Sequence, residues 1–286
     1  MIDRKITYPE IESLLEIVAD KYDYDFRNYA PPTLLRRITL FLEQNKLRSA
    51  NELIIRIKTD KSVFEALFAK LTICVTEMFR DPEIYHTLRT NVLPYLATYP
   101  KINIWHAGCA TGEEAYSMAI LLTEYGLYER TQIYATDISN NALASAKEGV
   151  FSSESMELYE INYKKAGGQN SVHDYFNTKH NMLVVNPSLK KNILFSNHNL
   201  ITDSVFAKMH LILMRNVLIY FNRPLQNRVL ELADSSLVKK GFLCLGTKET
   251  LSFSDIISRY QEVDRKNRIY QKTPTKFHGT QHTTKP

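Results

Sequence analysis

The residues that could do chemistry are concentrated in one segment, which reads IWHAGCATGEEAYS from Ile104 to Ser117. A short apolar run leads into Gly108 and Gly112, and the carboxylates Glu113 and Glu114 follow before an apolar stretch with helical character. A strand, a glycine loop and a helix start are typical of a site for a nucleotide-like ligand. A phosphate-binding loop would carry Lys and Ser or Thr after the last glycine, whereas acids would repel phosphate. The pattern therefore favours a cationic ligand.

A second acidic position narrows the ligand further. Asp137 closes the strand-like run IYATD, and a carboxylate at the end of the second strand can accept hydrogen bonds from both hydroxyls of a ribose. S-adenosylmethionine combines an adenosine with an amine and a sulfonium, so it suits acids at both Glu113 and Asp137. A glycine-rich turn with solvated acids is the plainer interpretation of the loop alone. The glycine loop after the first expected strand and Asp137 at the end of the second strand together favour S-adenosylmethionine as the ligand.

Two regions with different periodicities must position these residues. Helical spacing of apolar residues before Gly108 predicts a helical domain over residues 1–78, with helices at 11–18, at 34–42 after two prolines, and over Leu53–Leu71. A connecting helix is expected over 79–100, with Asp81 as its cap and Pro82 at its first position. Residues 101–272 then alternate between strand-like and helical runs, which predicts a doubly wound, mostly parallel sheet.

The second region also has expected internal boundaries. Helices are predicted at Glu114–Tyr125 and Pro224–Lys239. Residues 150–191 are long for a crossover, rich in Tyr and Asn, and contain two adjacent glycines, so they are expected to form an inserted subdomain. The polar segment 273–286 is expected to be a disordered tail.

Composition excludes several classes of protein. No apolar run in the 286 residues is long enough for a membrane span, and the N-terminus lacks the apolar segment of a signal peptide, so a cytoplasmic protein without membrane insertion is expected. Cys74, Cys109 and Cys244 are odd in number and scattered, which argues against a disulfide scaffold or a zinc site. His106 lacks neighbouring ligands, so a packing or polar role is expected for it and no metal is predicted.

The net charge of +5 does not indicate nucleic-acid binding. Six of the Lys and Arg residues lie in 265–286, which contain no acid, so the rest of the chain is almost neutral. A nucleic-acid surface should instead lie on the folded body. We therefore expect no nucleic-acid partner.

Four motifs resemble those of the chemotaxis receptor methyltransferases, the CheR family. They are TEMFRDP (Thr76–Pro82), AGCATGEEAYS (Ala107–Ser117), ATDIS (Ala135–Ser139) and RNVLIYF (Arg215–Phe221). The resemblance, over about residues 11–272, implies an α/β, Rossmann-like class I S-adenosylmethionine-dependent methyltransferase with an N-terminal all-α domain and a small β insertion. It also implies a monomer that methylates glutamate side chains on the cytoplasmic helices of chemoreceptors, which gives glutamyl methyl esters.

The resemblance also implies roles for particular residues. An Arg and a Tyr near the transferred methyl group correspond to Arg80 and Tyr220. Where the family often has a cofactor-binding Asn, this chain has Cys74, a weaker hydrogen-bonding group. Ala115 replaces the usual Pro, and the late GHSE motif becomes Gly246–Glu249. The expected cofactor positions are Cys74, Thr76, Arg80, Gly108, Gly112, Glu113, Asp137, Asn199, Leu200, Arg215 and Asn216.

The sequence leaves the target open. Arg36 and Arg37 are adjacent, so they cannot both face a helix core, and docking onto an acidic receptor bundle stands beside a solvated face as an interpretation. In the family the insertion can bind receptor tails. A methyltransferase of the same fold for another protein or nucleic acid, or a catalytically weak cofactor-sensing scaffold, remains an alternative.

Overall fold

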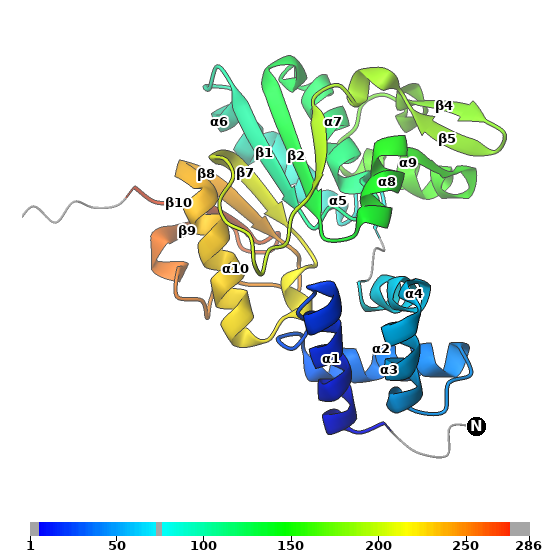
Figure 1. The fold of residues 1–286 in the computed structure, drawn as a ribbon. Helices are drawn as coiled ribbons and strands as arrows, with labels where there is room; N and C mark the ends of the chain where they lie inside the picture. Colours follow the sequence, from blue (N-terminus) through cyan, green and yellow to red (C-terminus); the bar gives the residue numbers. More distant parts are fainter. Residues whose placement is uncertain (1–5, 73–75, 275–286) are drawn as a thin grey trace, which may run out of the picture.

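The computed structural model describes residues 6–72 and 76–274, and it contains a group of four helices and a larger α/β unit (Figure 1). The helices are α1 (Tyr8–Tyr22), α2 (Pro31–Gln44), α3 (Ala50–Thr59), α4 (Lys61–Leu71), α5 (Pro82–Thr87), α6 (Leu93–Leu96), α7 (Glu113–Glu124), α8 (Asn140–Glu148), α9 (Met156–Lys165) and α10 (Arg223–Ser236). The strands are β1 (Ile102–Ala107), β2 (Thr131–Asp137), β3 (Val150–Ser152), β4 (Phe176–Lys179), β5 (Met182–Val185), β6 (Ile193–Asn197), β7 (Met209–Met214), β8 (Leu237–Leu245), β9 (Tyr260–Asp264) and β10 (Ile269–Lys272).

Helices α1–α4 form the helical domain, and they pack through the apolar faces that the spacing predicts. Leu14, Ile38 and Leu53 are fully buried between them. The stretch from Leu53 to Leu71 is helical as expected, but Asp60 divides it into two helices, α3 and α4. Asp60 has an extended backbone, and its carboxylate accepts the backbone N–H of Ser62 at 2.8 Å. A short acceptor at this position satisfies a free N–H of the new helix, so α4 begins there.

The seven-stranded sheet has the order β6-β2-β1-β7-β8-β10-β9. Strands β6, β2, β1, β7 and β8 are parallel, whereas β10 runs antiparallel to both of its neighbours. The chain order reverses between β1 and β7, and ligands of doubly wound sheets bind at such a switch point, beside the carboxyl ends of the strands. The expected mostly parallel sheet is confirmed, but the antiparallel strands β9 and β10 were not anticipated.

The two faces of the sheet bury different helices. On β1, Ile102 and Ile104 pack with α5–α7, whereas Trp105 and Ala107 pack into a core that continues through α10 into the helical domain. This alternation follows from the two-residue period of a strand that is covered on both faces. The helical domain therefore shares a continuous core with one face of the sheet.

Two predicted boundaries need correction. The helix expected over Pro224–Lys239 is α10, which ends at Ser236, and Leu237 already begins β8. The connecting helix does start at Pro82, but its helical segment contains a π-helical turn at Leu88–Val92, and the Asp81 side chain makes no cap. Asp81 has φ 55° and contacts Arg215 instead.

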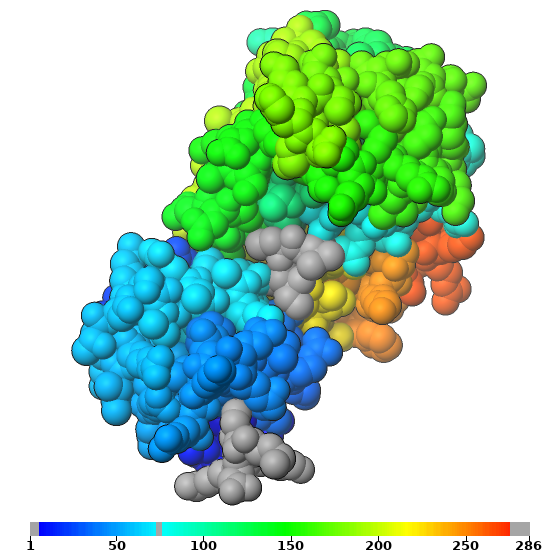
Figure 2. Space-filling view, turned by 90° about the vertical axis from the view of Figure 1, so that its right-hand side faces the viewer, coloured from blue at the N-terminus to red at the C-terminus, as the bar shows by residue number. Residues whose placement is uncertain are grey.

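The insertion forms its own small structure, as expected. Its three-stranded antiparallel sheet has the order β3-β5-β4 and lies beside α9 at the end of the molecule opposite the helical domain (Figures 1 and 2). In Figure 2 the insertion lies at the upper end of the visible face, and the helical domain lies at its lower end. Residues 275–286, most of the expected disordered tail, lie outside the described residues. No helix in the described part of the chain is long and apolar enough to cross a membrane.

A short strand-like contact joins the helical domain to the sheet. The backbone N–H of Ala30 donates to the carbonyl of Tyr220 at 2.8 Å, and that of Asn222 donates to the carbonyl of Asn28 at 2.9 Å. The rings of Tyr29 and Phe221 also meet edge to face, with centroids 5.2 Å apart. The segment after β7 is therefore fixed to the helical domain by two backbone hydrogen bonds and a ring contact.

Candidate functional site

The glycine loop after β1 has a backbone that only glycine adopts readily. Gly108 has φ 80° and Gly112 has φ 95°, both in the left-handed region. A Cβ on Gly108 would come within 2.6 Å of a methyl group of Val217, and one on Gly112 would lie 3.0 Å from the Cβ of Ala146. The Gly108 N–H also donates to the carbonyl of Thr136 at 2.8 Å. The loop is therefore held tightly between the ends of β2 and β7.

Asp137 lies at the end of β2, where the sequence places it. Its two oxygens accept the backbone N–H groups of Ala110 and Ser139, each at 2.9 Å. Each carboxylate oxygen has a second lone pair for a ligand. Burial raises the pKa of Asp137, while the two N–H donors oppose this effect. The site thus has a fixed acceptor in a poorly hydrated place.

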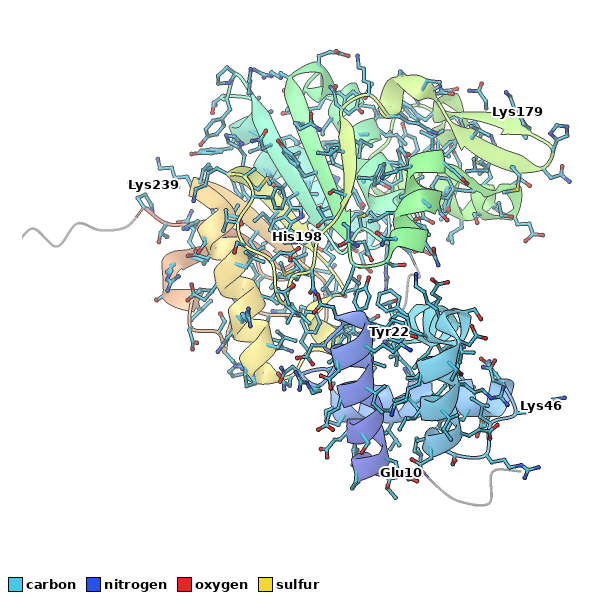
Figure 3. All side chains as sticks on the ribbon, in the orientation of Figure 1. Glu10, Tyr22, Lys46, Lys179, His198 and Lys239 are labelled. Carbon is cyan, nitrogen blue, oxygen red and sulfur yellow. The ribbon has the colours of Figure 1, made fainter. Side chains whose placement is uncertain are left out.

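A pocket opens beside Asp137 at the carboxyl ends of the strands. It encloses about 680 Å³ of space, a volume that includes its open mouth. Figure 3 marks His198, which lines the pocket and whose ring meets that of Trp105 in β1 edge to face. The pocket is lined by Tyr29, Leu71, Thr72, Gly108, Ala110, Asp137, Ile138, His198, Asn199, Leu200, Ile201, Asn216, Val217, Tyr220 and Phe221.

The helical domain forms one wall of this pocket and orients Tyr220. The guanidinium of Arg37 lies over the Tyr220 ring, 4.6 Å from its centroid, and it donates to the carbonyl of Leu71. Arg37 is only 4% exposed, so its expected docking role on the surface is wrong. Arg36, the neighbouring residue, is exposed and keeps that prediction.

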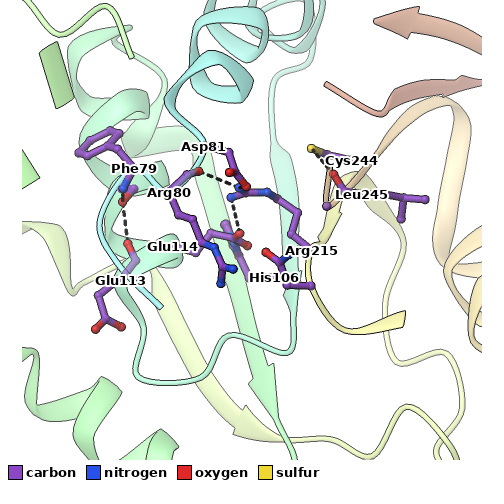
Figure 4. Close-up of polar contacts among 12 residues, drawn as sticks. Phe79, Arg80, Asp81, His106, Glu113, Glu114, Arg215, Cys244 and Leu245 are labelled. Carbon is purple, nitrogen blue, oxygen red and sulfur yellow. Dashed lines mark hydrogen bonds and ion pairs between the residues drawn. The ribbon is translucent and has the colours of Figure 1, made fainter. Parts of the chain in front are cut away.

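A buried ion-pair network lies behind the pocket (Figure 4). Arg215 is fully enclosed, and it pairs with Glu114 and Asp81 at 2.8 Å each. It also donates to the backbone carbonyl of Arg80 at 2.7 Å. Glu114 takes a further hydrogen bond from His106 at 2.8 Å, which confirms the polar role expected for that histidine. These pairs hold the pKa of Glu114 below its usual value and raise that of Arg215, despite burial.

Glu113 differs sharply from its neighbour Glu114. Its side chain is buried, and it accepts a hydrogen bond from the hydroxyl of Thr111 at 2.6 Å. In the part of the chain that the structure describes, no Lys or Arg forms an ion pair with it. Burial raises the pKa of Glu113 as a result. A buried carboxylate without a cation is costly, so the position suits a cationic ligand.

The structure brings together only part of the predicted site. Gly108, Asp137, Asn199, Leu200, Asn216 and Tyr220 line the pocket. Gly112, Glu113, Arg215, Thr76 and Arg80 lie outside its lining, and Cys74 lies outside the described residues. For Arg215 the geometry shows an ion-pair centre in place of a pocket contact. The remaining ligand contacts stay predictions.

Several lining residues were not predicted. Ile138, His198, Ile201 and Val217 directly adjoin predicted positions, and Ala110 lies between Gly108 and Gly112, so the same motifs carry the signal for them. Tyr29 and Thr72 come from the helical domain, and they reach the pocket only through tertiary packing. Among the residues that the structure describes, no group of three or more His, Cys, Asp or Glu could hold a metal ion.

Comparison with known proteins identifies the family. Residues 74–266 match the family model described as CheR methyltransferase, SAM binding domain, and residues 9–72 match CheR methyltransferase, all-alpha domain. The chain belongs to the CheR methyltransferase family. Its fold is accordingly an all-α N-terminal part followed by a class I methyltransferase sheet, and its cofactor is S-adenosylmethionine.

Individual relatives agree with this assignment. The chain is 45% identical to the putative methyltransferase Cher3 of Pseudomonas putida, over 96% of this chain and all of the relative. It is 28% identical to chemotaxis protein methyltransferase 1 of Pseudomonas aeruginosa, over 79% of this chain and 84% of that one. A solved structure, the N-methyltransferase NodS from Bradyrhizobium japonicum with S-adenosyl-L-homocysteine, gives a TM-score of 0.33 at 13% identity, with coverage of 59% and 62%. That likeness is too low to support an argument.

The residues present fit the cofactor. Asp137 offers fixed acceptors at the end of β2, where a ribose is expected, and Glu113 is a buried anion that lacks a cation. Gly108 and Ala110 both line the pocket, and both have a backbone in the left-handed region. A positive charge of the cofactor at Glu113 stays a prediction, because Glu113 lies outside the pocket lining.

We predict that cofactor affinity is lost as the pH falls. This loss should begin at a higher pH than the protonation of an exposed carboxylate would give. Burial raises the pKa of Asp137 and of Glu113, and the charged forms are the ones that bind hydroxyls and an amine. Protonation as the pH falls through these raised values therefore removes affinity. Calorimetry with S-adenosylhomocysteine between about pH 5 and pH 7.5 measures this effect, because ordinary carboxylates titrate near 4.

Two variants serve as test and control. Asp137→Ala should weaken binding at neutral pH by about 1–3 kcal/mol, the cost of unpaired buried polar groups. Asp255→Asn, at an exposed carboxylate, should change neither the affinity nor its pH dependence. Full affinity in Asp137→Ala would remove Asp137 from the ribose role.

Proposed function

We propose that the protein transfers the methyl group of S-adenosylmethionine to glutamate side chains on the cytoplasmic helices of chemoreceptors, forming glutamyl methyl esters. Relatives named as chemotaxis protein methyltransferases support this proposal, as does the family itself. The observation that carries it is Tyr220, which lines the cofactor pocket and has the guanidinium of Arg37 over its ring. A hydroxyl and a nearby positive charge suit an anionic acceptor.

The chemistry places modest demands on the protein. A glutamate carboxylate, with a pKa of about 4.3, is already ionised at neutral pH, so no side chain must remove a proton. Bound S-adenosylmethionine supplies an electrophilic methyl group on its sulfonium. The chain must align the acceptor in line with that group and exclude water, and such positioning can supply up to about 7–11 kcal/mol.

Three parts of the chain share this positioning. Asp137 and Glu113 hold the cofactor, and the helical domain closes one side of its pocket through Tyr29, Leu71 and Thr72. Tyr220 can donate one oriented hydrogen bond to the acceptor, because Arg37 fixes its ring. Arg80 provides paired donors for a carboxylate, either that of the cofactor or that of the acceptor. Arg36 is the exposed cation on α2 that we assign to receptor docking. We expect the protein to act as a cytoplasmic monomer.

Labelled methyl transfer tests this function. The protein is incubated with S-adenosylmethionine labelled in its methyl group and with membranes that contain receptors; receptor-free membranes are the control. We expect label on a receptor-sized protein, and its release as methanol in base, because carboxyl esters hydrolyse there. A base-stable label would indicate another target. Cofactor binding with no transferred label would indicate a sensing scaffold.

We also predict how the reacting centre responds to mutation. Tyr220→Phe removes one hydroxyl and keeps the ring, so cofactor affinity should survive while single-turnover transfer slows by about 10–100-fold, as for a lost orienting group. Arg80→Ala should cost more. In the unmodified protein the rate should show no titration between about pH 6.5 and pH 8.5, because a base would impose its own pKa.

The contrary results are distinct from these. A steep rise of rate with pH that Tyr220→Phe abolishes would make Tyr220 a base, and the acceptor would then not be a carboxylate. Full activity in both variants would remove Arg80 and Tyr220 from the site.

A further inference from the structure

Glu249 lies behind the pocket and gathers an unusual number of backbone donors. One of its oxygens accepts the N–H groups of Val217 at 2.8 Å, Leu218 at 2.7 Å and Ile219 at 3.3 Å. The other oxygen accepts those of Asn216 at 3.0 Å and Gly246 at 2.6 Å. The side chain is 4% exposed, so these bonds are made away from water.

The backbone that Glu249 holds is the one that carries the reacting centre. Asn216 has φ 60°, a left-handed conformation that is uncommon for residues other than glycine. A short 3₁₀ turn, Leu218–Tyr220, follows directly. Asn216, Val217 and Tyr220 all line the cofactor pocket. A turn that follows a strained residue needs an external partner for its N–H groups, and Glu249 is that partner.

We propose that Glu249 is a positioning residue for methyl transfer, which sets the placement of Tyr220 through the backbone of residues 216–219. This inference rests on the proposed function, because it assigns Tyr220 to the acceptor. Glu249 does not line the pocket, so it acts on the reaction only through this segment. Its carboxylate also ties the end of β7 to the end of β8 through Gly246, which fixes the segment relative to the sheet.

This contact depends on both the charge and the shape of the Glu249 side chain. An anion can accept from all five N–H groups, whereas an amide has one acceptor oxygen and would point its own NH₂ group at the remaining donors. Glu249→Gln therefore keeps the side-chain volume and breaks part of the contact. Gly246→Ala is a second route: a Cβ there would come within 2.8 Å of both the Asn216 nitrogen and a Glu249 oxygen. It moves the two apart without removing the charge.

Kinetics provide the first test, with Glu262→Gln, at an exposed carboxylate, as the matched control. In Glu249→Gln we expect single-turnover transfer at saturating cofactor to fall by about 10²-fold, since small misplacements have costs of this size. The effect of Tyr220→Phe should shrink in the Glu249→Gln background, because both changes act on one group. A purely structural glutamate would lower thermal stability and leave these two effects independent.

Hydrogen exchange provides a second test that needs no activity. Glu249→Gln and Gly246→Ala should speed exchange of the amides of residues 216–219 and leave those of β1 and β2 protected. If Glu249→Gln does not fold, Gly246→Ala decides the matter with the same readouts. Unchanged exchange, or additive effects with Tyr220→Phe, would overturn the proposal. Faster exchange in the variants together with no receptor methylation by the unmodified protein would overturn the proposed function alone.

Discussion

The site depends most on one buried cation, the guanidinium of Arg215. It joins three parts of the chain that lie far apart in sequence: the end of β7, the first turn of α7 through Glu114, and the Arg80–Asp81 loop. Burying a charge is expensive, and removing one partner of such a pair typically costs about 3–5 kcal/mol because the other charge is then unpaired. The buried charge of Arg215 is tolerated because its guanidinium donates to Glu114, to Asp81 and to the Arg80 carbonyl. It places the Arg80 loop beside the strand that leads to Tyr220.

Glu113 and Glu114 are neighbours in one short motif, but their side chains have different surroundings. The Glu114 carboxylate is bound to Arg215 and His106, whereas the Glu113 carboxylate accepts from the hydroxyl of Thr111. Successive residues of a helix point in different directions, so adjacency in sequence separates them in function. The same division occurs after β7, where Arg215 turns inward and Asn216 lines the pocket. The helical domain completes the site from the other side, because its core continues into one face of the sheet.

Much of this could be predicted from the sequence, for reasons tied to particular residues. Gly108, Asp137 and Asn216 sit at strand ends, and strand ends of a parallel sheet meet at one edge. The burial of Arg37, the pairing of Asp81 with Arg215 and the contribution of Tyr29 all depend on how two distant parts pack, which local pattern does not encode. Apolar residues recur at helical spacing from Leu53 to Leu71 because α3 and α4 both bury one apolar face. This pattern does not reveal that the helix is interrupted at Asp60. Strands β9 and β10 are short, and neither alternates strictly between buried and exposed positions, so they carry little periodic signal.

Replacement of Arg215 by Lys tests most directly whether this cation positions the reacting groups or binds the cofactor itself. Lys keeps the positive charge, but its compact ammonium lacks the planar fork that reaches Glu114, Asp81 and the Arg80 carbonyl together. The measurements are calorimetric affinity for S-adenosylhomocysteine and single-turnover methyl transfer at saturating cofactor, on protein whose fold is verified by circular dichroism. We expect transfer to fall by about tenfold or more while the affinity for S-adenosylhomocysteine changes far less. A loss confined to cofactor affinity, or transfer at the unmodified rate, would contradict it.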